Sequence, residues 1–539
     1  MRPSLTIMLI VLEAALLATA LGAPNAEPQG AAPRTAGSPF ESDAWSTPAN
    51  AVDAPVLAKL REKGLEPANP CSDEVFVRRV YLDVIGTLPE PEEVTGFLKD
   101  RRPEKRAALI DALLQRPEFA DYWALKWCDL LRVKAEFPIN LWPNAVQAYH
   151  RWVRDSLREN RPYDQFAREL LTSSGSNFRV PPVNFYRAIQ GRDAPATDRA
   201  RSVAEAVALT FMGTRLDTMP PARRSGLAAF FLRLAYKPTA EWKEEIVCLD
   251  PAPAAAVDAG FPDGTKVRIA PGDDPRVVFA DWLVTPTNPW FARNIVNRVW
   301  FWLLGRGVIH EPDDIRPDNP PSNPELLTCL EKELVKAHWD LRQVYRLILN
   351  SRTYQQSSIP RSDRPEADAL FAHYLVRRLH AEVLVDALSW IGGTGEGYSS
   401  AIPEPFTYIP EGQRTIALAD GSITSPFLQM FGRPPRDTGL ESERNNQPSD
   451  AQRLYWLNSS DVQRQIERSR RLGRLILGAR GNRADLIRWT YLTLLSRNPT
   501  PAELAAAEAH FQTNGLGPKQ AADDLAWALI NTKEFLYRH

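Results

Sequence analysis

Apolar residues recur along most of the chain with the spacing of an α-helix. Val75, Val80 and Val84 fall on one helical face, with Ser72 as a capping residue before them and Gly86 as a stop after them. The strongest pattern of this kind begins at Asn288-Pro289. The same period predicts helices over 198–212, 322–336, 365–391, 449–472, 482–496 and 518–536. We therefore expect a mainly α, multi-helical protein.

Stretches with the composition of β-strands are few. They cover 245–249, 266–270 and 415–418, and they predict a small β-containing insertion near 240–275 and an irregular insertion near 392–448. The length of 539 residues allows about three core-forming units. We expect a signal peptide at 1–23, a disordered linker at 24–50, an N-terminal helical domain at 51–236, the β-containing or irregular insertion at 237–275, and a C-terminal helical domain at 276–539.

A helical unit recurs near the two ends of the chain. Each copy has a Tyr-Leu pair in one helix, a proline corner, a second helix, and a last helix that ends on an aromatic residue. The landmarks are Tyr81, Pro91 and Phe119 in the first copy, Tyr491, Pro501 and Phe535 in the last, and Tyr354 in a partial third. The unit is similar to the short helical modules of phycobilisome-linker-type proteins, which scaffold rather than catalyse; chance similarity among amphipathic helices is the alternative.

The N-terminus has the pattern of a secretory signal. Arg2 precedes a mainly apolar run from Leu5 to Leu21, and small residues follow it; a buried N-terminal helix is the alternative interpretation. Residues 24–50 are rich in Ala, Pro, Gly and Ser, which is typical of a tether. No later stretch reaches the about 18 apolar residues that a membrane span requires. We expect an exported protein, periplasmic or extracellular, without a stable membrane span after signal removal.

Charge and cysteine content narrow the possible partners. The chain has 65 Lys and Arg against 66 Asp and Glu, a formal net charge of −1, which argues against a nucleic-acid partner. Cys71, Cys128, Cys248 and Cys329 lie too far apart for a zinc motif, and both disulfides and free thiols remain open for them. The seven histidines form no metal-binding pattern. We therefore expect no metal site.

Three blocks of residues carry a family resemblance. They are 118–166, which opens with EFADYWALKW; 281–355, which contains NPWFARNIVNRVW; and 431–459, which opens with FGRP. In these blocks the chain resembles the secreted planctomycete cytochrome-associated proteins, whose two halves are domains of unknown function fifteen-forty-nine and fifteen-fifty-three. The resemblance spans roughly residues 50–539 and implies a two-part helical protein.

One departure from the family concerns a cofactor. Members of this subtype carry a C-x-x-C-H stretch after a G-x-R-L-like turn, which implies covalent haem or a metal. Here the turn at 213–217, GTRLD, leads into TMPP, and the cysteines and the histidine are absent. Covalent haem needs both thiols and an axial histidine. The sequence therefore predicts no c-type haem, and we expect no other cofactor.

The helix after Asn288 carries the first candidate site, a ligand-binding cluster of Arg293, Asn297, Arg298 and Trp300. Arg293 and Asn297 are four residues apart and share a helix face. A guanidinium offers paired planar donors and, together with an amide and an indole, suits a carboxylate, a sulfate or a sugar. The alternative is structural: these side chains tie the helix to neighbouring loops, for example through Asp313.

A proline-rich loop carries the second candidate site, in which Arg433, Glu443 and Arg444 are the candidate catalytic residues. Two carboxylates, Glu441 and Glu443, beside several arginines can act as an acid/base pair with an electrophilic clamp, as in glycoside chemistry. In extended backbone both glutamates point the same way. The alternative is a buried ion-pair network that fixes an irregular segment to the core.

Other polar residues are weaker candidates. Glu382 and Asp386 lie four apart on a predicted helix, a spacing that an exposed helix also shows. His150 stands beside aromatic residues, where a histidine satisfied within the core is the default interpretation. The tryptophans at 123, 127, 142 and 152 fit a core better than a sugar-binding platform. No G-x-S-x-G, P-loop or G-x-G-x-x-G motif supports serine hydrolase or nucleotide chemistry.

Two functions remain open from the sequence. The first is a non-haem envelope or extracellular protein that binds or scaffolds a glycan or a partner protein; the linker-like repeats, the neutral charge and the missing haem motif favour it. The second is an extracellular enzyme that acts on polysaccharide, with the two Arg-rich clusters in one cleft. The relative position of the two clusters distinguishes these hypotheses.

Overall fold

Helices make up about half of the chain. The structure, a computed structural model, describes residues 38–251 and 255–539. Its first part contains α2 (Asp53–Lys63), α3 (Asp73–Val84), α4 (Pro91–Lys99), α5 (Lys105–Leu114), α6 (Pro117–Leu130), α7 (Pro143–Arg158), α8 (Tyr163–Thr172), β1 (Gly175–Ser176), α9 (Asn184–Arg187), α10 (Ala196–Val207), α11 (Pro221–Ala229), β2 (Leu234–Pro238), β3 (Glu245–Leu249), β4 (Val257–Gly260) and β5 (Lys266–Ile269).

The second part is helical except for two very short strands. It contains α12 (Pro275–Leu283), α13 (Phe291–Leu304), α14 (Pro324–Lys336), α15 (Leu341–Leu349), α16 (Glu366–Ala369), β6 (Arg377–Arg378), α17 (Ala381–Gly392), α18 (Pro426–Met430), α19 (Asp450–Asn458), α20 (Ser460–Glu467), α21 (Arg470–Gly478), α22 (Arg483–Leu495), α23 (Pro501–Phe511), α24 (Pro518–Ile530), α25 (Lys533–Leu536) and β7 (Tyr537–Arg538). The prediction of a mainly α fold with small β insertions is confirmed.

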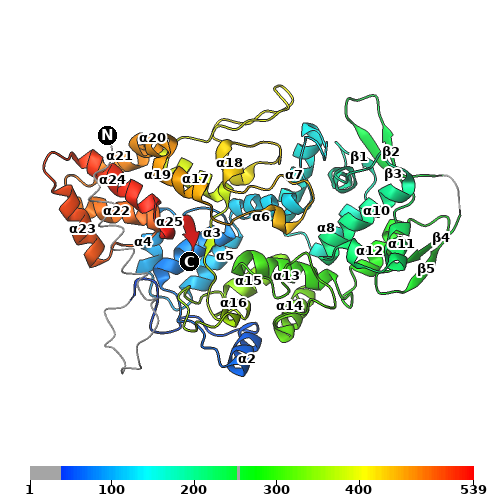
Figure 1. The fold of residues 1–539 in the computed structure, drawn as a ribbon, viewed down its shortest axis with the longest axis horizontal. Coiled ribbons are helices and arrows are strands. Elements are labelled where there is room, and N and C mark those ends of the chain that lie inside the picture. The colour runs from blue at the N-terminus through cyan, green and yellow to red at the C-terminus, as the bar shows by residue number, and fades with distance from the viewer. Residues whose placement is uncertain (1–37, 252–254) are drawn as a thin grey trace.

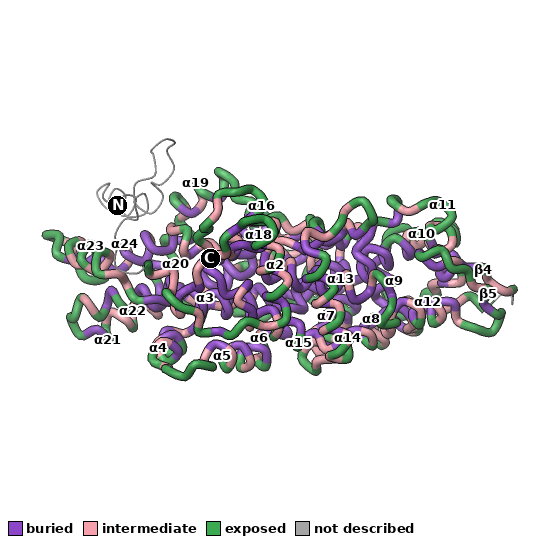
Figure 2. The backbone as a smooth tube through the Cα atoms, turned by 90° about the horizontal axis from the view of Figure 1, so that it is seen from below, coloured by how far each residue is buried: buried purple, intermediate pink, exposed green. Residues whose placement is uncertain are grey.

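The body is elongated, with α21 to α24 at one end and β2 to β5 at the other (Figure 1). Buried residues follow its long axis (Figure 2). They form one continuous hydrophobic core that reaches from Val52 to Phe535. The two predicted helical domains therefore share a core in the folded chain.

The β-structure joins the N-terminal half to the insertion. Strand β3 lies between β1 and β2, and Gly175 pairs with Val247 in antiparallel register. The strand predictions for 245–249 and 266–270 are confirmed by β3 and β5, but the strand predicted at 415–418 is wrong. A 3₁₀ turn lies at Thr415–Ala417 instead, because the Asp386 carboxylate accepts the N–H groups of Thr415 (2.6 Å) and Ile416 (3.1 Å) and holds the backbone in a turn.

Three of the long helices predicted from the sequence are interrupted. The segment 365–391 breaks at β6, whose backbone pairs with β7 near the end of the chain. The segment 449–472 is divided into α19, α20 and the start of α21, because Ser459 and Ser469 each cap a new helix. Thr532 caps α25 and divides 518–536 in the same way.

The repeated unit folds alike at both ends of the chain. Helices α3 to α6 correspond in order to α22 to α25. In each copy the proline corner starts a helix with a capping box, Glu90 with Glu93 and Thr500 with Glu503. An arginine pairs with the later glutamate of each capping box: Arg116 with Glu93 at 3.0 Å, and Arg497 with Glu503 at 2.7 Å. The aromatic ends of the copies, Phe119, Phe535 and Tyr354, are buried.

Part of the predicted linker is packed against the body. The signal segment 1–23 and residues 24–37 lie outside the described residues. From residue 38 onward the chain follows the protein surface: Ser42 donates its N–H to the Pro70 carbonyl at 2.9 Å, and Thr47 is buried and donates to Gln355 at 2.6 Å. The segment 38–50 is therefore anchored by hydrogen bonds, in contrast to the tether expected from its composition.

Candidate functional site

Helix α13 directs its central polar side chains into the protein interior. Arg298 is fully buried, pairs with Asp313 at 2.6 Å and donates to the Asn294 side chain at 3.0 Å. Asn297, also buried, forms two hydrogen bonds of 2.9 Å with the backbone of Ile309, one to its N–H and one to its C=O. These contacts tie the helix to the loops that follow it.

The other two residues of the first candidate site point elsewhere. The Arg293 side chain is 36% exposed and pairs with Glu331 of α14 at 2.6 Å. Trp300 is buried, with its ring centroid 5.1 Å from that of Phe371. Of the four predicted ligand-binding residues, only Arg293 reaches the surface, so the four do not share one open face.

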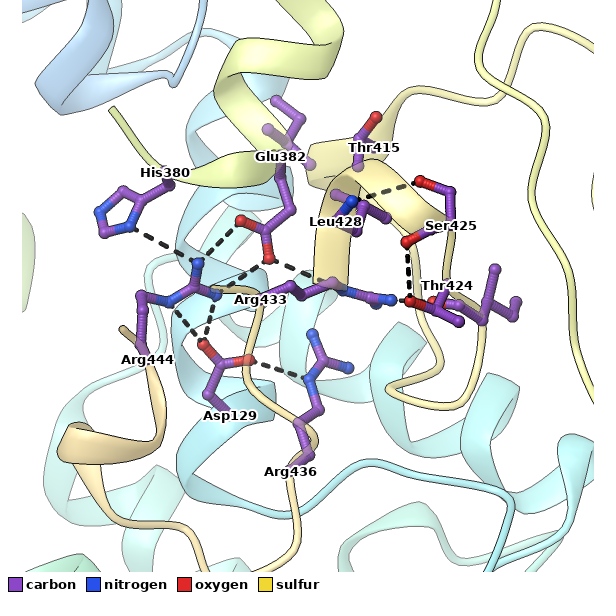
Figure 3. A network of polar contacts seen from close by, with 12 residues as sticks. Asp129, His380, Glu382, Thr415, Thr424, Ser425, Leu428, Arg433, Arg436 and Arg444 are labelled. Carbon is purple, nitrogen blue, oxygen red and sulfur yellow. Dashed lines mark hydrogen bonds and ion pairs between the residues drawn. The ribbon is translucent and has the colours of Figure 1, made fainter. Parts of the chain in front are cut away.

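Arg444 is the centre of the second candidate site (Figure 3). Its guanidinium donates to both carboxylate oxygens of Glu382, at 2.7 and 3.1 Å, and to Asp129 at 2.6 and 3.2 Å. The Glu382 side chain is completely buried and that of Arg444 is 4% exposed. Burial alone raises the pKa of Glu382, but Arg444 and Arg433 outweigh it and hold this pKa at about 2.

Two further arginines complete this network. Arg433 lies 3.6 Å from Glu382 and donates to the carbonyl oxygens of Asp420 and Ile423. Arg436 pairs with Asp129 at 2.9 Å, on the side opposite Arg444 (Figure 3). The three arginines of the loop thus hold two carboxylates, one from α6 and one from α17, and fix the loop to both helices.

The two glutamates of the loop do not form a pair. The backbone at Glu441–Glu443 is a 3₁₀ turn, so the expectation of extended backbone with both carboxylates on one side is wrong. Glu443 accepts the N–H groups of Asp437 (3.2 Å) and Thr438 (2.6 Å) and shapes the loop. Glu441 instead accepts a hydrogen bond of 3.0 Å from the Trp302 indole.

Glu441 connects the two candidate sites inside the protein. Its carboxylate lies 3.6 Å from Arg298, and its N–H donates to Asp313 at 2.7 Å. Lys126 of α6 is buried nearby and interacts electrostatically with both Glu441 and Arg444. The two Arg-rich clusters therefore form one interior network rather than two walls of an open cleft.

Sequence reasoning missed two members of this network, Lys126 and Asp129. Both belong to α6, whose other buried residues are almost all apolar. Charged residues are rarely buried unless they are paired, so two charges three residues apart in an apolar helix were a usable signal. Their partners were not readable, because these come from α17 and the 431–446 loop.

Replacing Lys126 with methionine is expected to stabilise the protein, and to do so most at and below about pH 7. Burial, followed by repulsion from Arg444, lowers the pKa of Lys126 to about 7, whereas an unfolded lysine titrates near 10.4. At pH values between these two pKa values, the unfolded wild-type chain binds more protons than the folded protein does. The free energy of unfolding of the wild type therefore rises with pH in this range. The advantage of Lys126→Met over the wild type should shrink by about 2 kcal/mol between pH 7 and pH 9.

Denaturant unfolding at the two pH values measures this change. Lys332→Met, at an exposed position of α14, serves as the control and should show no such dependence. An advantage of Lys126→Met that is equal at pH 7 and pH 9 would contradict the prediction.

A surface cleft of about 550 Å³ opens between α7 and residues 406–423. Arg151 and Arg154 line it from α7, and Phe406 and Tyr408 from the loop. His150 also lines it: it is 7% exposed, and its Nε2 atom has no hydrogen-bond partner among the described residues. Burial and the neighbouring arginines lower the pKa of His150 to about 3, so the ring is neutral near pH 7. His150 is therefore not the satisfied core histidine expected from the sequence.

Exposed aromatic side chains border this cleft. Phe406 is 52% and Tyr408 69% exposed. The ring of Trp142 lies 5.3 Å from that of Phe406 and is only half-buried. Trp123 and Trp127, in contrast, are core residues, as the sequence predicted.

The described residues offer no metal site and no membrane span. Within 38–251 and 255–539, no group of three or more His, Cys, Asp or Glu side chains is arranged to hold a metal ion. All four cysteines are free thiols, which decides between the alternatives left open by the sequence. In the same ranges no helix has the length and apolarity needed to cross a bilayer.

Comparison with known proteins identifies two matching family models. Residues 51–218 match a protein of unknown function (DUF1549), and residues 275–511 match a protein of unknown function (DUF1553). Neither the curated proteins nor the solved structures contain a match to the chain. The first matched region includes α6 and α7, and the second includes α13, α17 and the 431–446 loop.

Proposed function

Since the chain belongs to the two-part family of proteins of unknown function described by these two models, we propose that it is an exported, non-haem binding protein whose ligand is a glycan. It acts outside the cytoplasm, in the envelope or the extracellular space. The observation that carries this proposal is that Arg444 and Glu443, the central candidate catalytic residues, are saturated by partners inside the protein.

The saturation argues against catalysis by the cluster. A general acid or base must come within hydrogen-bonding distance of the reacting group. The Arg444 donors are directed at Glu382 and Asp129, and the Glu443 carboxylate accepts two backbone N–H groups. Neither residue lines the cleft beside α7. The network therefore supports a structural role for Arg433, Glu443 and Arg444.

The cleft beside α7 supports the binding role. It combines exposed aromatic rings with polar side chains, the mixture that sugars require: C–H faces stack on aromatic rings, and hydroxyl groups need hydrogen-bond partners. The secretory pattern at 1–23 supports contact with extracellular material. The absent C-x-x-C-H motif supports a protein without c-type haem.

A panel of polysaccharides tests the proposal with the protein as it is secreted. We expect retention on at least one polysaccharide in affinity electrophoresis and no release of reducing ends. Glu443→Gln should bind as tightly as the wild type, because Glu443 lies outside the cleft. Release of reducing ends by the wild type, and its loss in a folded Glu443→Gln variant, would instead establish the polysaccharide-degrading alternative.

A further inference from the structure

We infer that the cleft between α7 and residues 406–423 binds an acidic polysaccharide, one that carries carboxylate or sulfate groups. The inference rests on the proposed glycan-binding function and adds to it the surface and the class of ligand. Three features of the surface carry it: a row of exposed aromatic rings, neutral lining residues with unpartnered polar atoms, and two cations that have no acidic partner in the part of the chain that the structure describes.

The aromatic rings lie along the cleft and beyond it. Tyr408 and Phe406 stand at its edge, and Phe406 contacts Trp142 at 5.3 Å between ring centroids. The ammonium group of Lys243 lies 5.9 Å from the Trp142 ring and 5.2 Å from that of Trp242, which is 69% exposed. Exposed aromatic side chains that cluster in this way mark a contact surface. Its extent suits several sugar units in a row, as in a polysaccharide.

Three segments far apart in the sequence build this surface. Trp142 precedes α7, Phe406 and Tyr408 belong to the irregular insertion, and Trp242 lies in the turn between β2 and β3. The first two segments are joined by hydrogen bonds, because the Glu136 carboxylate accepts the Ala401 N–H at 2.9 Å. This contact links the segment that precedes α7 to the irregular insertion.

Two residues that line the cleft, His150 and Thr407, carry neutral polar atoms that are buried and, among the described residues, unpartnered. The Nε2 atom of His150 and the hydroxyl of Thr407 are both without a hydrogen-bond partner in the described part of the chain. A neutral imidazole carries one donor and one acceptor, as a sugar hydroxyl does. Buried polar atoms normally have partners, so the unmet capacity of these two groups marks this cleft as a place for a hydroxyl-rich ligand.

The charges of the surface favour an anion. Arg154 is paired with Asp121, and the Asp420 carboxylate accepts the N–H groups of Ala135 and Ser422. Both acidic side chains of the cleft are therefore engaged. Arg151 is exposed and, within the ranges that the structure describes, has neither an ion-pair nor a hydrogen-bond partner. With Lys243 it leaves positive charge next to the aromatic row, which complements carboxylates or sulfates.

Two pairs of polysaccharides that differ in charge test this inference by affinity electrophoresis. Polygalacturonate is compared with its methyl ester, and dextran sulfate with dextran, so that the carboxylate and sulfate sources are distinguished. We expect at least ten-fold tighter retention on the charged member of at least one pair. Arg151→Gln should weaken that retention about five-fold, and the double variant Phe406→Ala, Tyr408→Ala at least ten-fold.

Matched controls lie elsewhere on the surface. Arg268→Gln changes a 75% exposed arginine of β5, and Leu477→Ala a 79% exposed apolar residue of α21. Both should retain wild-type binding, and all variants should keep the melting temperature of the wild type, because each change is at an exposed side chain.

The possible contrary results are distinct. Equal retention on the charged and neutral members would overturn the choice of an acidic ligand and leave the glycan-binding function intact. Binding to an acidic polysaccharide that the cleft variants leave unchanged would overturn this surface as the site. If the protein bound DNA as tightly as polygalacturonate, charge attraction alone would explain the retention. That result would overturn the inference of a site for a polysaccharide. Retention on no polysaccharide would end both the inference and the proposed function.

Discussion

Arg444→Met is expected to lower the free energy of unfolding by about 3–5 kcal/mol, as the removal of one partner from a buried ion pair does. Methionine keeps much of the side-chain volume, so the loss reflects the charge and its hydrogen bonds. In the variant, Glu382 stays completely buried, and Arg433, 3.6 Å away, is its remaining ion-pair partner among the described residues. Asp129 keeps Arg436 at 2.9 Å, so Glu382 is the more affected carboxylate.

The loss in Arg444→Met should depend on pH. The pKa of Glu382 is held at about 2 in the folded protein, below the value of about 4.3 for an unfolded glutamate. A carboxylate whose pKa is lower in the folded protein than in the unfolded chain stabilises the protein at pH values above its unfolded pKa. This stabilisation is lost as the pH falls toward the pKa of the folded protein. The difference between wild type and variant should therefore be largest above pH 5 and shrink between pH 4.5 and pH 2.

Denaturant unfolding followed by tryptophan fluorescence measures both effects. Arg453→Met, at a 69% exposed arginine paired with Asp450, is the control and should change stability by less than about 0.5 kcal/mol. An Arg444→Met variant within about 1 kcal/mol of the wild type at pH 7 would contradict the structural role of the network. Arg444→Lys should lie in between, because an ammonium group cannot bond to both carboxylates in planar pairs.

Gly432→Ala is expected to cost at least about 3 kcal/mol of stability, through left-handed backbone strain together with a steric clash. Gly432 has φ of +80°. A Cβ atom at this position would lie 1.7 Å from the backbone oxygen of Asn445, a distance that forces the main chain to move. Arg378 donates to the carbonyls of Phe431 (2.8 Å) and Asn445 (3.1 Å), so the displacement breaks the contacts that close the loop.

Gly473→Ala is the matched control for this substitution. Gly473 lies within α21, where an added Cβ atom meets nothing within 4 Å. Alanine is the better helix former, so this variant should be stabilised by about 0.5–1 kcal/mol. Thermal unfolding of the two variants beside the wild type tests the pair. Equal melting temperatures for Gly432→Ala and the wild type would show that the loop adapts without cost.

Element positions were predictable where a local signal specified them. The cap at Ser72 is present, with its hydroxyl accepting the Val75 N–H, and the proline corners at Pro91 and Pro501 start helices in both copies of the repeat. The predictions failed where distant residues decide the backbone. The Asp386 carboxylate makes a turn of 415–417, and β7 holds residues 377–378 in a strand in the middle of a predicted helix.

The sequence by itself determined the helical character, the repeated unit, the family and the residue types that gather in the two Arg-rich segments, because helical period, caps and motifs are local. Tertiary structure alone decided what those residues contact. Glu382, Asp129 and Arg444 come from three separate elements, and their burial makes them partners of one another. The aromatic row likewise joins three segments whose proximity is set by packing and long-range hydrogen bonds, which no local pattern encodes.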